Sequence, residues 1–237
     1  MPDSAQPLVL KIKPLHNVGV STNADERGTA STTPKARRYD ATLRRRQAEE
    51  SRRRVLDAAA ALFAERGWSV AMREIASAAG VSFETVYSNF GSKPRLFGQV
   101  IDVAVVGDDR PVALMDRPEF AALSHGSHVQ RAAAAASLVA AVNGRTVGLQ
   151  RALREGAAAD PALASRLDEI RQAQRQTVHI AGAAIAGREL TPLEGDGLWA
   201  VITMEVYDLL TGSAGWSRAR YEQWLTDTIV RLLTLDD

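Results

Sequence analysis

An all-α fold is predicted by three features of the sequence. Ala and Leu fill long stretches that hold little Gly or Pro, a composition that favours helices. Apolar residues recur at three- and four-residue spacing, and no segment alternates as a strand would. The chain of 237 residues is long enough for one large domain or two modest ones. We therefore expect a small helical head followed by a larger helical body.

A disordered, partly basic tail is predicted for residues 1–41. Ser, Thr, Gly and Asn are frequent in residues 21–34, which show no apolar period. A basic arm, residues 35–46, then leads into the first helix. Such an arm can lie in a DNA groove or along phosphates, and it can equally be a solvated tail. The basic residues of this arm are Lys35, Arg37, Arg38, Arg44, Arg45 and Arg46.

The head is predicted to span residues 42–106. Its first helix runs from about Thr42 to Arg66, and its second covers Met72–Ala79. A third helix lies within Ser82–Phe90, and its first residue is the expected N-cap. Ser92 caps the next helix in the same way. The side chains expected on the inner faces are Val55, Leu56, Ala59, Leu62, Phe63, Met72, Ile75, Ala76, Ala79, Val86, Phe90, Leu96, Phe97, Val100 and Ile101.

A linker, Gly107–Pro118, is expected to lead into a helical body of residues 119–237. Within the body, Leu198–Leu210 is apolar on nearly every side and must be covered all round. This segment would be covered if it packed on its own core on one side and on a partner subunit on the other. An ordinary intramolecular core is the alternative. The last helix is a second candidate interface. The helices expected in the body are Glu119–Ser124, His128–Asn143, Arg145–Ala158, Pro161–Ala186, Pro192–Thr211 and Ser217–Leu235.

Charge is distributed unevenly along the chain. The net charge is only +1, but residues 35–100 carry +6 and residues 101–237 carry −5. A basic head on an acidic body is typical of a protein that binds a polyanion with its head. Uneven surface charge without such a partner is the alternative.

Several classes of protein are disfavoured. There is no cysteine, so disulfides, thiolate catalysis and cysteine-ligated metals are excluded. The four histidines lack metal-site spacing, and we find no Gly-rich phosphate loop or nucleophile elbow. We therefore expect no enzyme, cofactor or metal. No apolar stretch of about 18 residues is evident, and the N-terminus lacks a signal core, so we expect a soluble, cytoplasmic protein.

The segment 72–97 has the pattern of a helix-turn-helix. Gly80 permits the tight turn, and Ala76 and Ala79 are small enough for a close helix crossing. The second helix buries Val86 and Phe90 and leaves a polar and aromatic outer face, as a DNA-reading helix does. That outer face comprises Phe83, Glu84, Thr85, Tyr87, Ser88 and Asn89.

This segment and the helix before it resemble the TetR family of transcriptional regulators. The match extends over about 50 residues with one consistent spacing. A second, weaker resemblance to one subgroup of the family covers Glu205–Leu210 and Gly215–Leu225 of the body. The motifs that carry the first resemblance are Val55-Leu56-Asp57-Ala58-Ala59, Leu62-Phe63-Ala64-Glu65-Arg66-Gly67-Trp68, Arg73-Glu74-Ile75-Ala76, Ala79-Gly80-Val81-Ser82, Thr85-Val86-Tyr87 and Phe90-Gly91-Ser92-Lys93.

The resemblance implies a homodimer of all-α subunits, each with a three-helix DNA-binding head and a ligand-binding, dimerising body. Phosphate contacts are implied for Arg73, Ser82, Thr85, Tyr87, Asn89 and Lys93. Base edges would be read by Phe83, Glu84 and Ser88. Alternatives remain for individual residues. Tyr87 can be a half-buried core residue, Ser82 can serve only as a cap, Lys93 can be an ordinary surface residue, and Glu84 can turn aside to Arg or solvent.

One departure from the family pattern lies before the motif. The loop Trp68–Met72 is one residue shorter than expected, and Ala71 stands where relatives carry a capping Thr. Because Ala cannot cap a helix, the expected cost is about 1 kcal/mol. Ser69 can substitute if the loop shifts. This departure is the sole support for a second hypothesis, an all-α ligand- or partner-binding protein that has lost DNA binding.

An effector pocket is implied somewhere in the body. His179, Trp199, Met204 and Tyr207 are the candidates to line it, with core packing as the alternative for each. The leading hypothesis is thus a sequence-specific DNA-binding transcriptional regulator, a repressor released by a small-molecule effector. Its partners would be a double-stranded DNA operator and a second copy of the chain. A helical enzyme would need a polar cleft that the sequence does not indicate.

Overall fold

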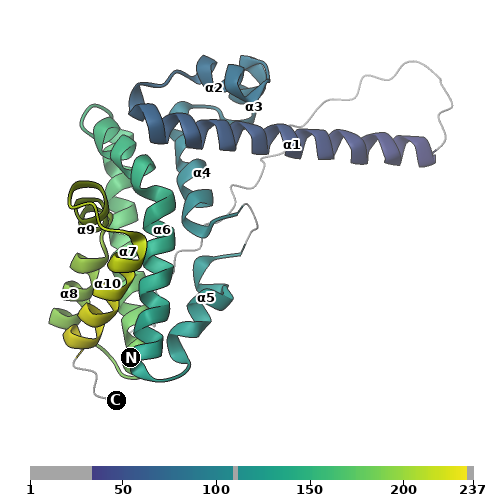
Figure 1. The fold of residues 1–237 in the computed structure, drawn as a ribbon. Helices are drawn as coiled ribbons and strands as arrows, with labels where there is room; N and C mark the ends of the chain where they lie inside the picture. Colours follow the sequence, from purple (N-terminus) through teal and green to yellow (C-terminus); the bar gives the residue numbers. More distant parts are fainter. Residues whose placement is uncertain (1–33, 109–111, 234–237) are drawn as a thin grey trace, which may run out of the picture.

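The computed structural model describes residues 34–108 and 112–233, and every regular element in these ranges is helical (Figure 1). The all-α prediction is therefore confirmed for this part of the chain. The α-helices are α1 (Pro34–Arg66), α2 (Met72–Ala79), α3 (Phe83–Phe90), α4 (Lys93–Val106), α5 (Pro118–Ala121), α6 (His128–Ala157), α7 (Pro161–Ala186), α8 (Pro192–Ile202), α9 (Met204–Asp208) and α10 (Arg218–Leu232). Short 3-10 turns are η1 (Gly67–Ser69), η2 (Leu114–Asp116) and η3 (Ala122–Ser124), and η4 (Leu209–Ser213) is a π-helix.

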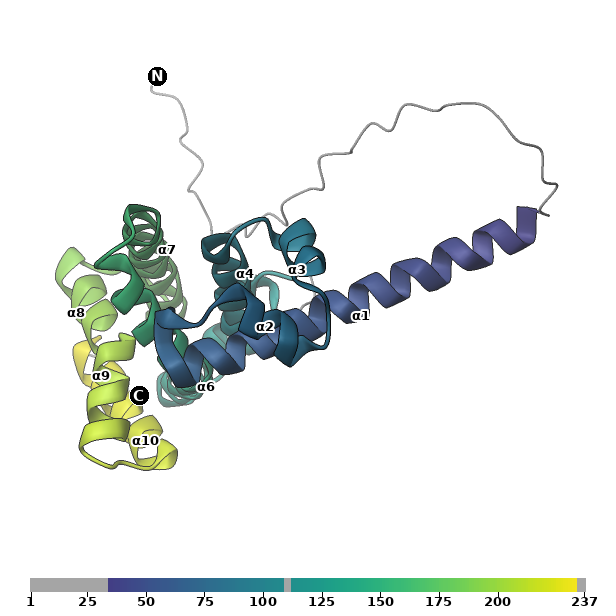
Figure 2. The same cartoon turned by 90° about the horizontal axis from the view of Figure 1, so that it is seen from above.

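Helices α1–α4 form a head at one end of a body built around α6. Helix α6 packs against α7 and α10 in the body and against α1 and α4 of the head. Figures 1 and 2 show α2 and α3 together on the outer side of α1, away from the body. The face of α3 that is not packed on the head is therefore turned away from the body.

The head has a dense apolar core. Of the fifteen side chains expected inside, thirteen are buried, while Leu62 and Met72 are half-buried and pack against them. The rings of Phe63, Trp68 and Phe97 meet with centroids 4.8–5.8 Å apart. The same cluster continues into α6 and α7 through Leu149, Ala152, Leu153 and Leu163. Head and body thus share one core.

Helix α1 begins at Pro34, earlier than the Thr42 predicted from sequence. After this proline the chain has no Gly or Pro until Gly67, and Ala, Arg, Gln and Glu are good helix formers. Pairs at i,i+4, Arg45–Glu49 and Arg53–Asp57, add support along the exposed surface. The helix therefore takes in residues assigned to the predicted tail, of which residues 1–33 lie outside the described ranges.

Helix α6 is continuous, whereas two helices separated at Gly144 were predicted. A single Gly costs a helix only about 1 kcal/mol, which packing at both ends offsets. Within the described ranges α6 alone is long and apolar enough to cross a membrane, with a mean hydropathy of 1.2 over its 18 most apolar consecutive residues. A central core helix gives the same signal, and α6 is surrounded by α1, α4, α7 and α10.

The predicted helix Pro192–Thr211 is wrong, because the chain breaks at Thr203. This residue is extended (φ −58°, ψ 151°), so α8 ends at Ile202 and α9 starts afresh. The break frees the carbonyl of Ile202, and the buried Asn143 Nδ2 donates to it at 3.0 Å. Neither Gly nor Pro marks position 203, so the sequence gives no sign of the corner. The apolar run therefore wraps around its own core, and Leu209 is left 61% exposed.

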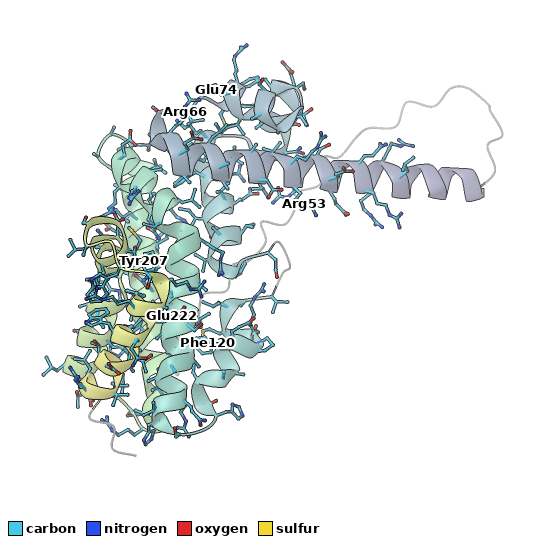
Figure 3. The ribbon with its side chains drawn as sticks, in the orientation of Figure 1. Arg53, Arg66, Glu74, Phe120, Tyr207 and Glu222 are labelled. Atoms are coloured by element: carbon cyan, nitrogen blue, oxygen red, sulfur yellow. The ribbon has the colours of Figure 1, made fainter. Side chains whose placement is uncertain are left out.

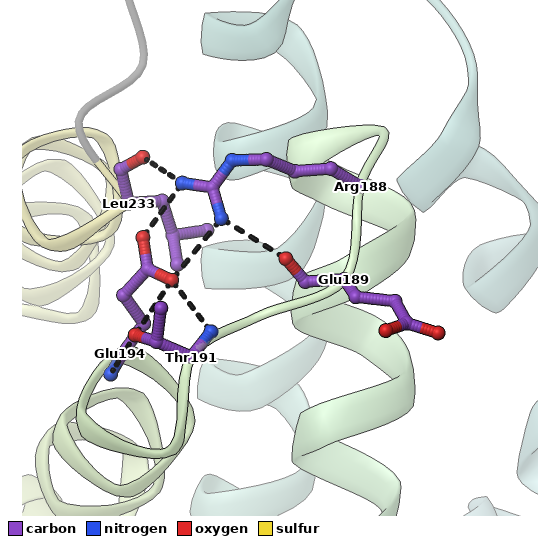
Figure 4. A network of polar contacts seen from close by, with 5 residues as sticks. All are labelled: Arg188, Glu189, Thr191, Glu194 and Leu233. Atoms are coloured by element: carbon purple, nitrogen blue, oxygen red, sulfur yellow. Dashed lines mark hydrogen bonds and ion pairs between the residues drawn. The ribbon is translucent and has the colours of Figure 1, made fainter.

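A polar network holds the turn between α7 and α8 (Figure 4). Arg188 donates two hydrogen bonds to the carboxylate of Glu194, at 2.6 and 3.1 Å, and one to the carbonyl of Leu233 at 3.1 Å. The same carboxylate accepts from the backbone N–H of Thr191, which is the N-cap of α8. The hydrogen bonds from Arg188, and after them those from the backbone and side chain of Thr191, lower the pKa of Glu194 from 4.5 to about 2. The Arg188 guanidinium therefore links α8 to the residue that follows α10.

Replacement of Glu194 by Gln is expected to cost stability in a pH-dependent way. A depressed pKa contributes stability that is complete above pH 4.5 and is lost as pH falls through about 2. The difference in free energy of unfolding between wild type and Glu194→Gln should thus be constant at pH 5–7 and shrink below. Urea unfolding at pH 7, 4 and 3 measures it. A difference that does not change with pH would contradict the assignment.

Candidate nucleic-acid interface

The turn between α2 and α3 is held by its own backbone. Gly80 has φ +64°, a left-handed conformation that favours glycine, and its N–H donates to the carbonyl of Ser77 at 3.1 Å. The N–H of Val81 donates to the carbonyl of Ala76 at 3.0 Å. Ser82 then caps α3, because its Oγ accepts from the Thr85 N–H at 3.1 Å. The predicted start of the third helix is confirmed.

Helix α3 has one buried and one exposed face. Val86 and Phe90 are buried, as predicted. The structure places Tyr87 at 59% exposure, so it is not a half-buried core residue. Its ring lies 6.2 Å from that of Phe83, which is partly exposed. The outer face thus brings together the predicted side chains Phe83, Glu84, Thr85, Tyr87, Ser88 and Asn89.

Two charged residues flank the aromatic pair. The guanidinium of Arg73, at the start of α2, lies 5.0 Å from the centre of the Phe83 ring. The pKa of Glu84 is lowered by its own backbone N–H, then by the hydroxyl of Ser82, with a smaller effect from Arg73. The Glu84 carboxylate therefore turns back to the start of its own helix. This placement favours the alternative in which Glu84 points aside, although its main contacts are with the helix start and Ser82 rather than with an Arg.

Lys93 lies against η1 rather than on the outer face of α3. Its Nζ donates to the carbonyl of Trp68 and stands 4.1 Å from the centre of the Trp68 ring. Burial lowers its pKa, and Glu155 and Glu74 act in the opposite sense. Here Lys93 joins the first turn of α4 to the η1 loop, a role that the sequence analysis missed.

The start of α2 lacks a side-chain cap at Ala71, as predicted. Ser69 does not replace it, because its hydroxyl donates to the carbonyl of Arg66 at 3.1 Å. Instead the carboxylate of Glu74 accepts from the Ala71 N–H at 2.8 Å and pairs with Arg66 at 2.7 Å (Figure 3). These two contacts lower the pKa of Glu74. A Glu at the third helical position is a known partner of the helix start, so the sequence held this signal.

The four residues predicted to line an effector pocket are not among those that line the cavity described below. His179 packs on Gly195 and lies 3.7 Å from Asp196, and Trp199 Nε1 donates to Gln174 at 3.4 Å. Tyr207 is buried edge-on against Tyr221, with ring centres 4.9 Å apart, and Met204 Sδ lies 3.8 Å from Arg154 Nη2. Each of them packs in the body.

A cavity of about 340 Å³ lies elsewhere, between the end of α4, the segment η2–η3 and α6. Arg145 of α6 donates from this cavity to the carbonyls of Ala104 and Val105, at 2.9 and 3.0 Å. Burial and the nearby Arg218 and Arg117 lower its pKa. The lining residues that matter here are Val106, Leu114, Arg117, Glu119, Leu138 and Arg145. The cavity is therefore part apolar, with two guanidinium groups in its wall.

Among residues 34–108 and 112–233, no three His, Asp or Glu side chains gather in a way that could hold a metal ion.

Residues 55–100 match the family model described as bacterial regulatory proteins, tetR family. The chain carries a TetR-family domain. The match runs from the second half of α1 through the helix-turn-helix into α4, so the resemblance found in the motif is confirmed. No curated protein gives a significant match to the chain.

Solved structures of three transcriptional regulators share the fold of this chain. A putative TetR-family transcriptional regulator from Mesorhizobium loti MAFF303099 is 24% identical, with a TM-score of 0.60, and the match covers 79% of this chain and 96% of that one. A transcriptional regulator from Rhodococcus sp. Rha1 is 21% identical (TM-score 0.54; 77% and 96%). NalD, the secondary repressor of the MexAB-OprM multidrug efflux pump in Pseudomonas aeruginosa, is 20% identical (TM-score 0.52; 78% and 96%). These relatives are covered almost completely, while about a fifth of this chain lies outside each match.

Proposed function

We propose that this TetR-family protein is a sequence-specific DNA-binding regulator, a cytoplasmic repressor that a small-molecule effector releases from its operator. The observation that carries the proposal is the outer face of α3. It is exposed, polar and aromatic, and it faces away from the body (Figure 2). A short helix of this kind enters the major groove of DNA in helix-turn-helix proteins.

The residues of this face divide into two roles. Arg73, Ser82, Thr85, Tyr87 and Asn89 would donate to phosphates and fix the position of the head. Phe83 and Ser88 would meet base edges, Phe83 by contact with a thymine methyl. Glu84 belongs to the base-reading set only if DNA draws its carboxylate away from the helix start. Lys93 would need to leave the Trp68 carbonyl to reach a phosphate.

A homodimer would place two such heads on paired half-sites. Exposed apolar side chains at the two ends of the α8–η4 region support a partner there. Leu193 is 84% exposed and Leu209 is 61% exposed. In contrast, Tyr221, Leu225 and Ile229 of α10 are buried within the chain.

The cavity beside α4 would hold the effector. Helix α4 follows α3 after only two residues, so a shift of its far end changes the setting of the recognition helix. Arg145 ties that end through the carbonyls of Ala104 and Val105. A ligand with an anionic group and an apolar part would compete for this guanidinium. Release of α4 would then couple effector binding to DNA release.

The hydroxyl of Tyr87 tests the assignment of the head. Full-length protein should select related duplexes from a random DNA library. Tyr87→Phe should weaken binding to all of them about fivefold, since one hydrogen bond to a charged phosphate contributes about 1 kcal/mol or more. Ser88→Asn should instead change which sequences are selected. Affinities by fluorescence anisotropy measure the first effect, and repeated selection measures the second.

Tyr207→Phe is the matched control, because it removes a hydroxyl from the buried body and should leave DNA affinity unchanged. If wild-type protein selects no sequence, the proposed function is wrong, and a ligand- or partner-binding role takes its place. The missing side-chain cap at Ala71 is the feature that favours that role. The Glu74 carboxylate accepts from the Ala71 N–H and so holds the start of α2 by a different contact.

A further inference from the structure

The N-terminal half of α1 is a basic rod that projects from the head. Figures 1 and 2 are seen from directions at right angles, and in both it extends beyond the other labelled helices. Residues 34–54 hold nine Lys or Arg and three Asp or Glu, a net charge of +6, whereas the whole chain carries +1. All of them precede Val55, where both the family match and the head core begin.

The surface of the rod fits a polyanion better than an apolar groove. Leu43 and Ala48 are the apolar residues in 43–54, so this stretch has no apolar stripe that a membrane or a protein core could cover. The side chains of Arg45 and Arg53 are 74% and 70% exposed. Each forms a long ion pair, at 3.9 and 4.0 Å, with the carboxylate four residues later in the chain. Exposed pairs of this kind contribute little, so these guanidinium groups can exchange a carboxylate for a phosphate.

The root of the rod lies beside the recognition helix. Arg52 donates to Gln99 of α4 at 2.6 Å, and its guanidinium lies 5.0 Å from the centre of the ring of Phe90, the last residue of α3. A Cβ at Gly80 would lie 3.6 Å from Arg54 Nη1. Residues 52–54 therefore adjoin both the turn before α3 and its end. The rod thus begins directly beside the recognition helix, and DNA bound by α3 would lie near it.

The rod is long enough to contact several base pairs of DNA. Eighteen residues, 34–51, rise about 27 Å as an α-helix. That length corresponds to about 8 base pairs, and each base pair carries two phosphate charges. We propose that the projecting half of α1 binds the phosphate backbone of the DNA that flanks the site read by α3. This inference rests on the proposed function, and it adds sequence-independent affinity to the specific contacts of α3.

The test uses the full-length chain and two duplexes. Both carry a sequence that the wild type selects from a random library, and one has about 10 further base pairs on each side, enough to span the rod. Two variants are compared with the wild type. One carries Arg44→Gln, Arg45→Gln and Arg46→Gln, and the other carries Lys at the same three positions. Arg, Lys and Gln have similar helix propensities, so both variants should keep the helix, but the Lys variant also keeps the charge.

We expect the wild type and the Lys variant to bind the long duplex about tenfold more tightly than the short one. The Gln variant should lose this advantage and bind the short duplex as the wild type does. Its salt dependence on the long duplex, the slope of log K against log salt, should fall by about 2–3 per chain, about one for each phosphate that the variant no longer neutralises.

The inference would be overturned if the wild type bound both duplexes equally, or if the Gln variant kept the salt slope of the wild type. Specific binding to the short duplex would still uphold the proposed function. Failure of the wild type to select any sequence would refute the proposed function and the inference with it. The rod would belong to another partner if the Gln substitutions changed only low-salt self-association, measured by sedimentation, or only binding to phosphatidylserine vesicles. Either result would also overturn the inference.

Discussion

Replacement of Gly148 by Val is expected to destabilise the protein by about 2–3 kcal/mol, because it overpacks the crossing of α1 and α6. A Cβ at position 148 would lie 2.8 Å from Ala64 Cβ and 2.9 Å from Ala64 Cα. The obstacle is the α1 backbone with a short side chain, so no rotamer change can relieve it. Urea unfolding followed by circular dichroism measures the loss. Because this crossing joins head to body, the variant should also bind selected DNA more weakly.

Gly98→Ala is the matched control for this substitution. Gly98 also lies inside a helix, α4, but nothing stands within 4 Å of a Cβ there. With no clash to offset it, the gain in helix propensity should leave the protein as stable as the wild type or about 0.5–1 kcal/mol more stable. If Gly148→Val unfolded at the same urea concentration as the wild type, the crossing would not be as close as described.

An amphipathic carboxylate that enters the cavity beside α4 is expected to weaken DNA binding about 10- to 100-fold, the usual range of coupling between two sites. A panel of branched and aromatic carboxylates, each with its primary amide, is the probe. Binding is followed by the rise in melting temperature, and release by the fall in anisotropy of labelled DNA. Only the acids should act, because Arg145 donates to backbone carbonyls and can exchange them for a carboxylate, whereas Arg117 is already paired with Asp108.

Arg145→Gln should abolish the thermal shift caused by the acids. The melting experiment contains no DNA, so this result does not depend on any change in the head. Arg151→Gln is the control on the same helix, since Arg151 pairs with Asp208 at the other side of the body core and does not line the cavity. Equal action of acids and amides, or an unchanged response of Arg145→Gln, would contradict recognition of an anion in this cavity.

Local chemistry was enough to predict the head. Ser82 and Ser92 cap α3 and α4, and Gly80 ends α2 in a left-handed conformation. Each of these features depends on one residue and its neighbours within a turn, so the sequence contains the whole cause. The outer face of α3 follows in turn from helical periodicity, which places Ser88 on the side opposite the buried Val86 and Phe90.

Tertiary contacts decided what the sequence did not show. The corner at Thr203 exists because Asn143, distant in sequence, satisfies the carbonyl that the break exposes. Gly144 leaves α6 intact because neighbouring helices hold both halves in line. The position of Lys93 depends on the Trp68 carbonyl and on the cluster of rings below it. The cavity is formed where the end of α4, the segment 114–122 and α6 meet, and no local pattern marks such a juxtaposition.

The apolar cluster common to head and body determines whether the head can be separated from the rest of the chain. Leu149, Ala152, Leu153 and Leu163 complete the core that α1 and α4 begin. A chain cut after Val106 would present the unfinished side of that core to water, as an adhesive patch beside the helix-turn-helix. Such a fragment would be less soluble than the full-length chain. The reading head of this protein is thus better regarded as one end of a single cooperative unit than as a detachable module.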